Sequence, residues 1–148
     1  MKVIIQRVLS ASCTIDDKVY SSIDKGYVLL VGFNHDDTKD IVDKLVNKII
    51  KLRLFSDEND QINLDIKTVS GSILSISQFT LYADCKKGNR PSFTKASPGY
   101  LASDLYDYFN EKLKMLHEDV KTGVFGADMK IALVNDGPVT IILDDKEL

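Results

Sequence analysis

Three uncharged polar side chains close a segment that otherwise has the composition of a buried strand. The segment 71–81 is mostly apolar up to Ile76, and Ser77, Gln78 and Thr80 then follow. Hydroxyl and amide groups at a strand end often bond the neighbouring backbone, and for this segment alone that structural interpretation is favoured. The functional interpretation is a polar cluster at the mouth of a pocket. Successive strand residues face opposite sides, so the Ser77 and Thr80 hydroxyls reach one ligand only if the strand ends between them.

A basic loop follows at residues 84–97, with the sequence DCKKGNRPSFTKAS. Its four cations and one aromatic ring could hold phosphate groups and stack a base; they are Lys86, Lys87, Arg90, Lys95 and Phe93. On charge alone, a solvated surface loop is an equally good interpretation. A segment of this length without regular structure is uncommon in a compact domain, which tilts the balance toward function.

A third stretch, NDGPVT at residues 135–140, consists of residues typical of turns. A hairpin connection is therefore the first interpretation. The Gly137–Pro138 bond could also be cis, as about 5–6% of X–Pro bonds in folded proteins are. The sequence leaves both possibilities open.

The motifs of several common enzyme classes are absent. The sequence has no GxSxG, P-loop, GxGxxG or HExxH pattern. His35 lies in an acidic segment and His117 at a predicted helix end, so exposed or capping roles are favoured over catalysis. Cys13 and Cys85 lack CxxC spacing, which argues against a disulfide framework or a zinc site. We expect no metal and no cofactor, and any catalysis must rest on positioning and backbone electrostatics.

The elements that must position these groups are predicted from hydrophobic periodicity. Strands are expected at 2–9 and 12–23, with a turn at 16–18, and at 26–33, where a continuous apolar run indicates burial on both faces. Further strands are expected at 62–66 and 71–81, and two more at 129–135 and 138–145, joined through a turn.

Two amphipathic helices complete the prediction. The first follows a cap at Asp37 or Thr38 and places Ile41, Leu45, Ile49 and Leu52 on one face. The second starts at Ser97–Pro98 and runs to about His117, with an apolar stripe of Leu101, Leu105, Tyr108, Phe109, Leu113 and Leu116. The fold class is therefore α/β, a layered domain in which a mostly antiparallel or mixed, barrel-like sheet is covered by two helices.

Length and composition indicate one domain spanning residues 1–148. Hydrophobic residues make up 44% and charged residues 28%, as in ordinary globular proteins. The net charge of −3 argues against a protein that coats nucleic acid but permits a small basic patch at one RNA end. No apolar run is long enough for a membrane span and no signal peptide is apparent at the start, so we expect a cytoplasmic protein.

Together the three stretches resemble the D-aminoacyl-tRNA deacylases. The resemblance covers essentially the whole chain, through QRVLSASCTI, VGFNHDDT, KLRLF, SQFTLYAD, KGNRPSFTKA and TGVFGADMKIALVNDGPVTI. SQFTL and NDGPVT correspond to the two signature motifs of that family. The resemblance implies hydrolysis of the ester that links a D-amino acid to the terminal adenosine of tRNA, and action on glycyl-tRNA mischarged on tRNA(Ala). It also implies a homodimer with its sites at the subunit interface.

The resemblance assigns roles to nine residues. Ser77, Gln78, Phe79 and Thr80 would line the pocket of one subunit, and the Gly137–Pro138 pair would enter it from the other with a cis bond. Phe125 and Met129 would flank the terminal adenine, and Arg7 would fix the Gly–Pro turn.

The implied mechanism is chiral selection by steric rejection. Backbone carbonyls of the Gly–Pro unit would hold the substrate ammonium group, and an L side chain would then collide with the backbone. Backbone N–H groups near Phe79 and Thr80 would form an oxyanion hole, with water or the tRNA 2′-hydroxyl as nucleophile and Thr80 as a positioning group. Two alternatives stay open: a dimeric tRNA-end-binding module without catalysis, and a generic Ser or Thr hydrolase of small esters.

Overall fold

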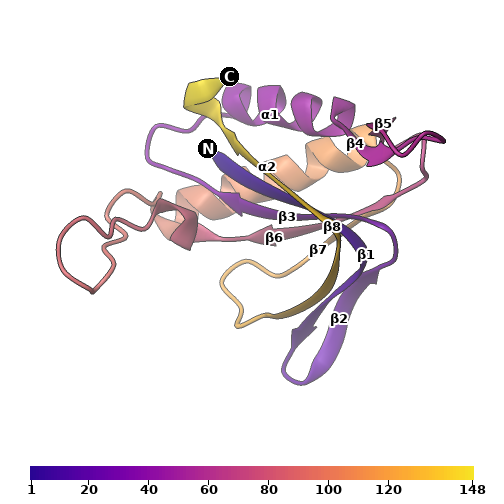
Figure 1. The fold of residues 1–148 in the computed structure, drawn as a ribbon. Coiled ribbons are helices and arrows are strands. Elements are labelled where there is room, and N and C mark those ends of the chain that lie inside the picture. The colour runs from indigo at the N-terminus through magenta and orange to yellow at the C-terminus, as the bar shows by residue number, and fades with distance from the viewer.

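The computed structural model describes residues 1–148, and its centre is one long strand that pairs with three others (Figure 1). Strand β1 (Lys2–Ile15) pairs with β3 (Gly26–Gly32) along its first half and with β2 (Lys18–Ile23) along its second half. Strand β8 (Lys130–Asp144) is antiparallel to β1 along both halves. The two ends of the chain therefore meet in one ladder.

The sheet continues on the far side of β3 with parallel pairing. Strand β6 (Ser72–Ser77) is parallel to β3, and β7 (Val120–Thr122) is parallel to β6. The strand order is β2-β1-β3-β6-β7 with β8 paired to β1, which confirms a mixed sheet. A separate hairpin is formed by β4 (Arg53–Ser56) and β5 (Ile62–Asp65).

One face of the sheet is covered by two helices, α1 (Lys39–Lys51) and α2 (Gly99–Leu116), as Figure 1 shows. A core of 23 buried residues fills this layer and includes Leu29, Ile49 and Phe109. The Thr38 hydroxyl caps α1 by accepting from the Ile41 N–H at 3.5 Å, one of the two predicted caps. Helix α2 begins at Gly99, one residue beyond Pro98, which occupies the N-cap position. The predicted pair of covering helices is therefore confirmed.

The other face of the sheet is concave, because the strongly curved sheet brings its edge strands together. A second hydrophobic cluster fills this concave side, with the buried residues Val8, Ala11, Cys13, Ile23, Val28, Leu74 and Ile76. The Ser21 hydroxyl of β2 donates to the Thr122 carbonyl of β7 at 2.8 Å and brings the two ends of the strand order together. The sheet is thus barrel-like, and β3 is buried on both faces as its apolar run predicted.

The prediction of two C-terminal strands joined by a turn at 135–138 is wrong. Strand β8 is continuous, because both of its halves pair with β1 in the same direction. Val8 pairs with Asn135 and Gln6 with Thr140, so residues 136–139 bulge out opposite Arg7. Residues that are typical of turns therefore form a bulge here, in which a short unpaired segment leaves a continuous strand.

Residues between β6 and α2 contain one short helical turn, η1 (Phe79–Tyr82), and then a long loop. A second short turn, η2 (Asp145–Glu147), follows β8. None of the helices is both long enough and apolar enough to cross a lipid bilayer.

Candidate active site

The polar segment that follows β6 is a change of structure rather than a continuing strand. β6 ends at Ser77, and the chain enters the turn η1 through Gln78. The Gln78 N–H donates to the Val31 carbonyl at 2.7 Å, which holds this end of the segment against β3. A Cβ at Gly32 would lie 2.8 Å from the Gln78 carbonyl oxygen, so the close approach requires glycine.

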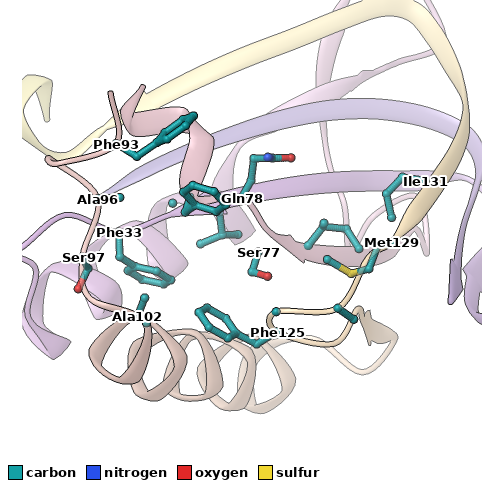
Figure 2. Close-up of a pocket in the computed structure, with 17 residues that line it drawn as sticks. Phe33, Ser77, Gln78, Phe93, Ala96, Ser97, Ala102, Phe125, Met129 and Ile131 are labelled. Atoms are coloured by element: carbon teal, nitrogen blue, oxygen red, sulfur yellow. The ribbon is translucent and has the colours of Figure 1, made fainter. Parts of the chain in front are cut away.

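A pocket with a volume of about 590 Å³ opens beside this point (Figure 2). Its walls come from the end of β3, the end of β6 with η1, the start of α2 with the loop before it, and the segment before β8. The 17 lining residues are Val31, Gly32, Phe33, Ile76, Ser77, Gln78, Phe79, Phe93, Ala96, Ser97, Gly99, Ala102, Phe125, Gly126, Ala127, Met129 and Ile131. None of these side chains is ionisable, so the pocket offers apolar walls with a few neutral polar groups.

Ser77 supplies a hydroxyl to the middle of the pocket. Figure 2 shows its side chain directed into the space between β6 and Phe125. Phe125 lies across the pocket, and Met129 and Ile131 form another side. A flat ligand ring therefore has an aromatic face and a thioether available to it.

Thr80 lies outside this lining set. It is exposed, and its hydroxyl accepts a hydrogen bond from the Gln78 side-chain amide at 2.5 Å. Of the four predicted SQFT residues, Ser77, Gln78 and Phe79 line the pocket and Thr80 stands on the turn beside them. The strand ends between the two hydroxyls, which is the geometry that the period-two count required.

The turn η1 also presents unused backbone donors. The N–H groups of Phe79 and Thr80 donate to no carbonyl elsewhere in the chain, as is usual for the first residues of a helical turn. Adjacent N–H groups of this kind can stabilise an anion or a developing oxyanion.

A second predicted group of residues meets at the bulge of β8. The Arg7 side chain is buried, and its Nε donates to the Asp136 carbonyl at 3.1 Å. The same Nε forms an ion pair with Asp136 Oδ2 at 3.2 Å, and Nη1 donates to the Leu54 carbonyl at 2.8 Å. Arg7 therefore holds the backbone of the bulge on one side and the β4 hairpin on the other.

The Gly137–Pro138 peptide at the bulge is cis and exposed. Gly137 has a φ of +123°, a conformation that side chains disfavour, and a Cβ there would lie 3.2 Å from Arg7 Nη2. Neither residue lines the pocket of its own chain. The structure thus brings Arg7, Gly137 and Pro138 together but separates them from the SQFT segment.

A buried hydroxyl supports the pocket from behind. Tyr106 of α2 donates to the Ser75 carbonyl at 2.7 Å, and its ring lies 6.1 Å from that of Phe125. Burial raises the pKa of Tyr106, so its hydroxyl stays protonated and continues to donate. Tyr106 thereby connects strand β6 to the aromatic wall.

The histidines contribute nothing to the pocket. His35 Nε2 bonds the Thr94 carbonyl at 2.8 Å, and His117, buried at the C-terminal end of α2, bonds the Gly71 carbonyl at 2.7 Å. Nowhere in the chain do three or more His, Cys, Asp or Glu side chains gather in a way that could hold a metal ion. The chemistry available at the pocket is binding, positioning and hydrogen bonding.

Several lining residues were not predicted as part of the site. Phe33 was predicted only as part of the apolar strand 26–33, and Ser97 as the end of the basic loop and the start of a helix. Ala96 and Ala102 look like ordinary small residues in the sequence. The sequence signal that pointed to part of this wall was the basic loop at residues 84–97, because its C-terminal end lines the pocket.

Comparisons with known proteins cover nearly all of the chain. A family model described as D-Tyr-tRNA(Tyr) deacylase matches residues 4–144. A solved structure described as "c-Myc DNA Unwinding Element Binding Protein" is 38% identical, covers 97% of this chain and 98% of its own, and has a TM-score of 0.92. Another, "Structural Analysis of a probable eukaryotic D-amino acid tRNA deacylase", is 16% identical, covers 96% and 97%, and has a TM-score of 0.86. The second likeness is one of fold.

Proposed function

Since this chain belongs to the D-Tyr-tRNA(Tyr) deacylase family, and is therefore a hydrolase of D-aminoacyl-tRNA, we propose that its catalytic site is the pocket at the end of β6. The observation that carries this proposal is a roomy pocket without ionisable side chains, bordered by a free hydroxyl and free backbone N–H groups. An aminoacyl-adenosine ester suits such a site, because its adenine base is flat and apolar-faced and its ester carbonyl needs hydrogen-bond donors. We further propose that the protein acts in the cytoplasm and also accepts glycyl-tRNA mischarged on tRNA(Ala).

The terminal adenine is placed between Phe125 and Met129. Base stacking on an aromatic ring stabilises binding by about 1–3 kcal/mol. The Met129 thioether is polarisable and adapts to the other side of the base. The ester carbonyl then lies between the Ser77 hydroxyl and the start of η1, where the N–H groups of Phe79 and Thr80 are unused donors.

The working unit is a homodimer. β8 pairs only with β1 and leaves its other edge free, and it carries the apolar side chains Val134 and Ile142 at 53% and 68% exposure. Leu9 of β1 is another exposed apolar residue. An exposed apolar strand of this length fits an interface between two copies. The exposed Gly137–Pro138 bulge of one copy would then enter the pocket of the other.

Chirality is selected by this bulge. Its backbone carbonyls accept hydrogen bonds from the substrate ammonium group, while the N–H groups of η1 hold the ester carbonyl. With these two groups fixed, a D side chain or the hydrogen of glycine points toward open space. An L side chain points into the backbone of the bulge, and its binding is disfavoured sterically.

Hydrolysis proceeds without a side-chain nucleophile. Water, activated by the adjacent tRNA 2′-hydroxyl, adds to the ester carbon, and the developing oxyanion is stabilised by the N–H groups of Phe79 and Thr80. The bond to the ribose oxygen breaks, and that oxygen leaves with the proton released by water. Thr80 holds Gln78 at the pocket rim and so acts as a positioning residue.

The test is release of amino acid from D-tyrosyl-tRNA and from L-tyrosyl-tRNA under identical conditions. We expect rapid release of D-tyrosine and a largely intact L ester. Equal hydrolysis of both esters would contradict the chiral mechanism, and hydrolysis of neither would contradict the activity. Chemical crosslinking of the same sample tests the homodimer.

A nucleic-acid-binding module without catalysis is the second candidate. The unpaired cations of the 84–97 loop and the ring of Phe93 at the pocket favour it, as does the name of the relative at 38% identity. Tight tRNA binding without any deacylation would favour this candidate over the enzyme.

A further inference from the structure

The loop at residues 84–97 is the part of the molecule that stands furthest from the sheet in Figure 1, where it projects to the left. It leaves from η1 and returns to the pocket wall through Phe93, Ala96 and Ser97. Its tip, residues 85–91, is exposed throughout. The loop therefore starts and ends at the pocket.

The base of this loop is held in a defined position. Asp84 and Ser92 exchange two backbone hydrogen bonds, of 2.7 and 2.9 Å, and the Lys86 N–H donates to Asp84 Oδ1 at 3.0 Å. The Phe93 ring packs edge-on against Phe79, with centroids 5.1 Å apart. The tip is thus carried on a closed hairpin-like base that is packed against the pocket rim.

The charge of the tip is unbalanced. Asp84 is the only acidic residue of the loop, and Lys95 Nζ already pairs with it at 2.9 Å. The Lys86 N–H and the Lys95 ammonium keep the pKa of Asp84 below its ordinary range, so this carboxylate stays charged and paired at neutral pH. The remaining cations, Lys86, Lys87 and Arg90, form no ion pair in the chain.

We propose that the tip of this loop, through Lys86, Lys87 and Arg90, binds phosphates of the tRNA 3′ strand that carries the ester. The inference rests on the proposed function, which puts the terminal adenosine in the pocket. An adenosine held there continues into the tRNA only through its 5′ phosphate, so the next phosphates must leave past the pocket rim. The loop that starts and ends at this rim carries three unpaired cations at its projecting tip. On a protein with a net charge of −3, such a local cluster matches a short stretch of phosphates rather than a long nucleic acid.

The loop then divides recognition into two parts. The pocket reads the ester and the adenine, and the loop holds the strand without reading its sequence, because phosphate contacts carry no base information. The loop thereby supplies affinity for tRNA in preference to free aminoacyl esters.

The experiment compares two substrates in the triple variant Lys86→Ala/Lys87→Ala/Arg90→Ala. On D-tyrosyl-tRNA we expect KM to rise about 100-fold at 0.1 M salt with kcat nearly unchanged, because each lost single-strand phosphate contact changes the salt exponent by about 0.7. The slope of log Kd against log salt should fall by about 2. On 3′-D-tyrosyl-adenosine, which has no phosphate, we expect unchanged kcat/KM.

The matched control is Lys18→Ala/Lys48→Ala/Lys51→Ala, which removes three exposed cations from β2 and α1 that form no ion pair. It should leave the KM and the salt slope within about twofold of the wild type. An equal effect of both triple variants would overturn the proposal, because the loop would then act only through net charge. An unchanged salt slope in the loop variant, or an equal loss on both substrates, would overturn it as well.

Asp84→Asn supplies a test in the opposite direction. Asparagine retains an oxygen that accepts from the Lys86 N–H, and Lys95 is released from its ion pair. We expect tRNA affinity to rise about fivefold at 0.1 M salt, the effect of one added phosphate contact. A fall in affinity would contradict the proposal. The binding titrations use uncharged tRNA, so they distinguish a failed loop assignment from a failed catalytic assignment, which appears only as absent hydrolysis.

Discussion

The pocket at the end of β6 and the bulge in the middle of β8 differ in shape, in the charge of the side chains around them and in the contacts that fix them. The pocket is a cavity of about 590 Å³ with apolar walls, a serine hydroxyl and free backbone donors. The bulge is a projection of exposed backbone, fixed from behind by the buried, charged side chain of Arg7. The pocket has space for a ligand, whereas the bulge has no cavity of its own and offers only exposed backbone. This difference underlies the proposal made above that each region is half of a site and that the two halves meet between two copies of the chain.

The largest effect is expected where the bulge is held. Arg7→Ala removes the donors to the Asp136 and Leu54 carbonyls and the ion pair with Asp136. We expect the free energy of unfolding to fall by about 2–4 kcal/mol, since buried acceptors lose a charged donor. Deacylation of D-tyrosyl-tRNA should fall more than about 100-fold, measured at a temperature where the variant is fully folded.

The control for this variant is Arg53→Ala. Arg53 is exposed and bonds Asn63, so its loss should change the free energy of unfolding by less than about 1 kcal/mol. Full activity in folded Arg7→Ala would show that the bulge needs no fixed geometry. It would contradict the distinction between a rigidly held bulge and an open pocket.

An intermediate effect is expected on the pocket side. Phe125→Ala removes one wall, and the loss of about 1–3 kcal/mol of base stacking should raise KM for D-tyrosyl-tRNA about 10–100-fold. Steady-state kinetics should show a smaller change in kcat, because the proposed position of the ester carbonyl is near Ser77 and η1 rather than Phe125. Tyr100→Ala, at a ring that is 78% exposed on α2, serves as the matched aromatic control. Equal KM changes in the two variants would argue against adenine at Phe125.

The smallest effect is expected at Thr80. Its hydroxyl accepts from Gln78 and no histidine or carboxylate is adjacent in the pocket, so Thr80→Ala should lower kcat about tenfold. Loss of a true nucleophile costs several orders of magnitude more, on the order of 10⁴ or greater. Single-turnover deacylation by Thr80→Ala and Thr80→Ser separates the two. A complete loss in the alanine variant with rescue by serine would favour the generic hydrolase.

The fold was predictable where local chemistry decides it. The turn at 16–18 places Asp16 and Asp17 at positive φ, a conformation that aspartate tolerates, and β3 is buried on both faces because its apolar run is continuous. The continuity of β8 was not predictable, since Asn135–Pro138 has the same composition in a hairpin and in a bulge. The choice between them depends on pairing with β1, which lies at the other end of the chain.

The residues of the candidate site likewise include some that the sequence identifies and some that it does not. Ser77 was identifiable because a polar residue at the end of an apolar strand breaks a pattern. Phe33 and Ala102 obey their patterns, and an apolar side chain that lines a pocket has the same sequence signal as one that fills a core. Only the long-range arrangement of β3, α2 and the segment before β8 leaves space beside these residues.

The pairing of β1 with β8 has a consequence for biosynthesis. Arg7 leaves the ribosome 129 residues before Asp136, whose carbonyl it binds. Contacts so distant in sequence form slowly, because a large loop must be closed before they contribute. The nascent chain therefore carries β1 with one edge unpaired until β8 has been synthesised. Any growing chain released before residue 130 would expose that edge to aggregation and would lack the bulge altogether.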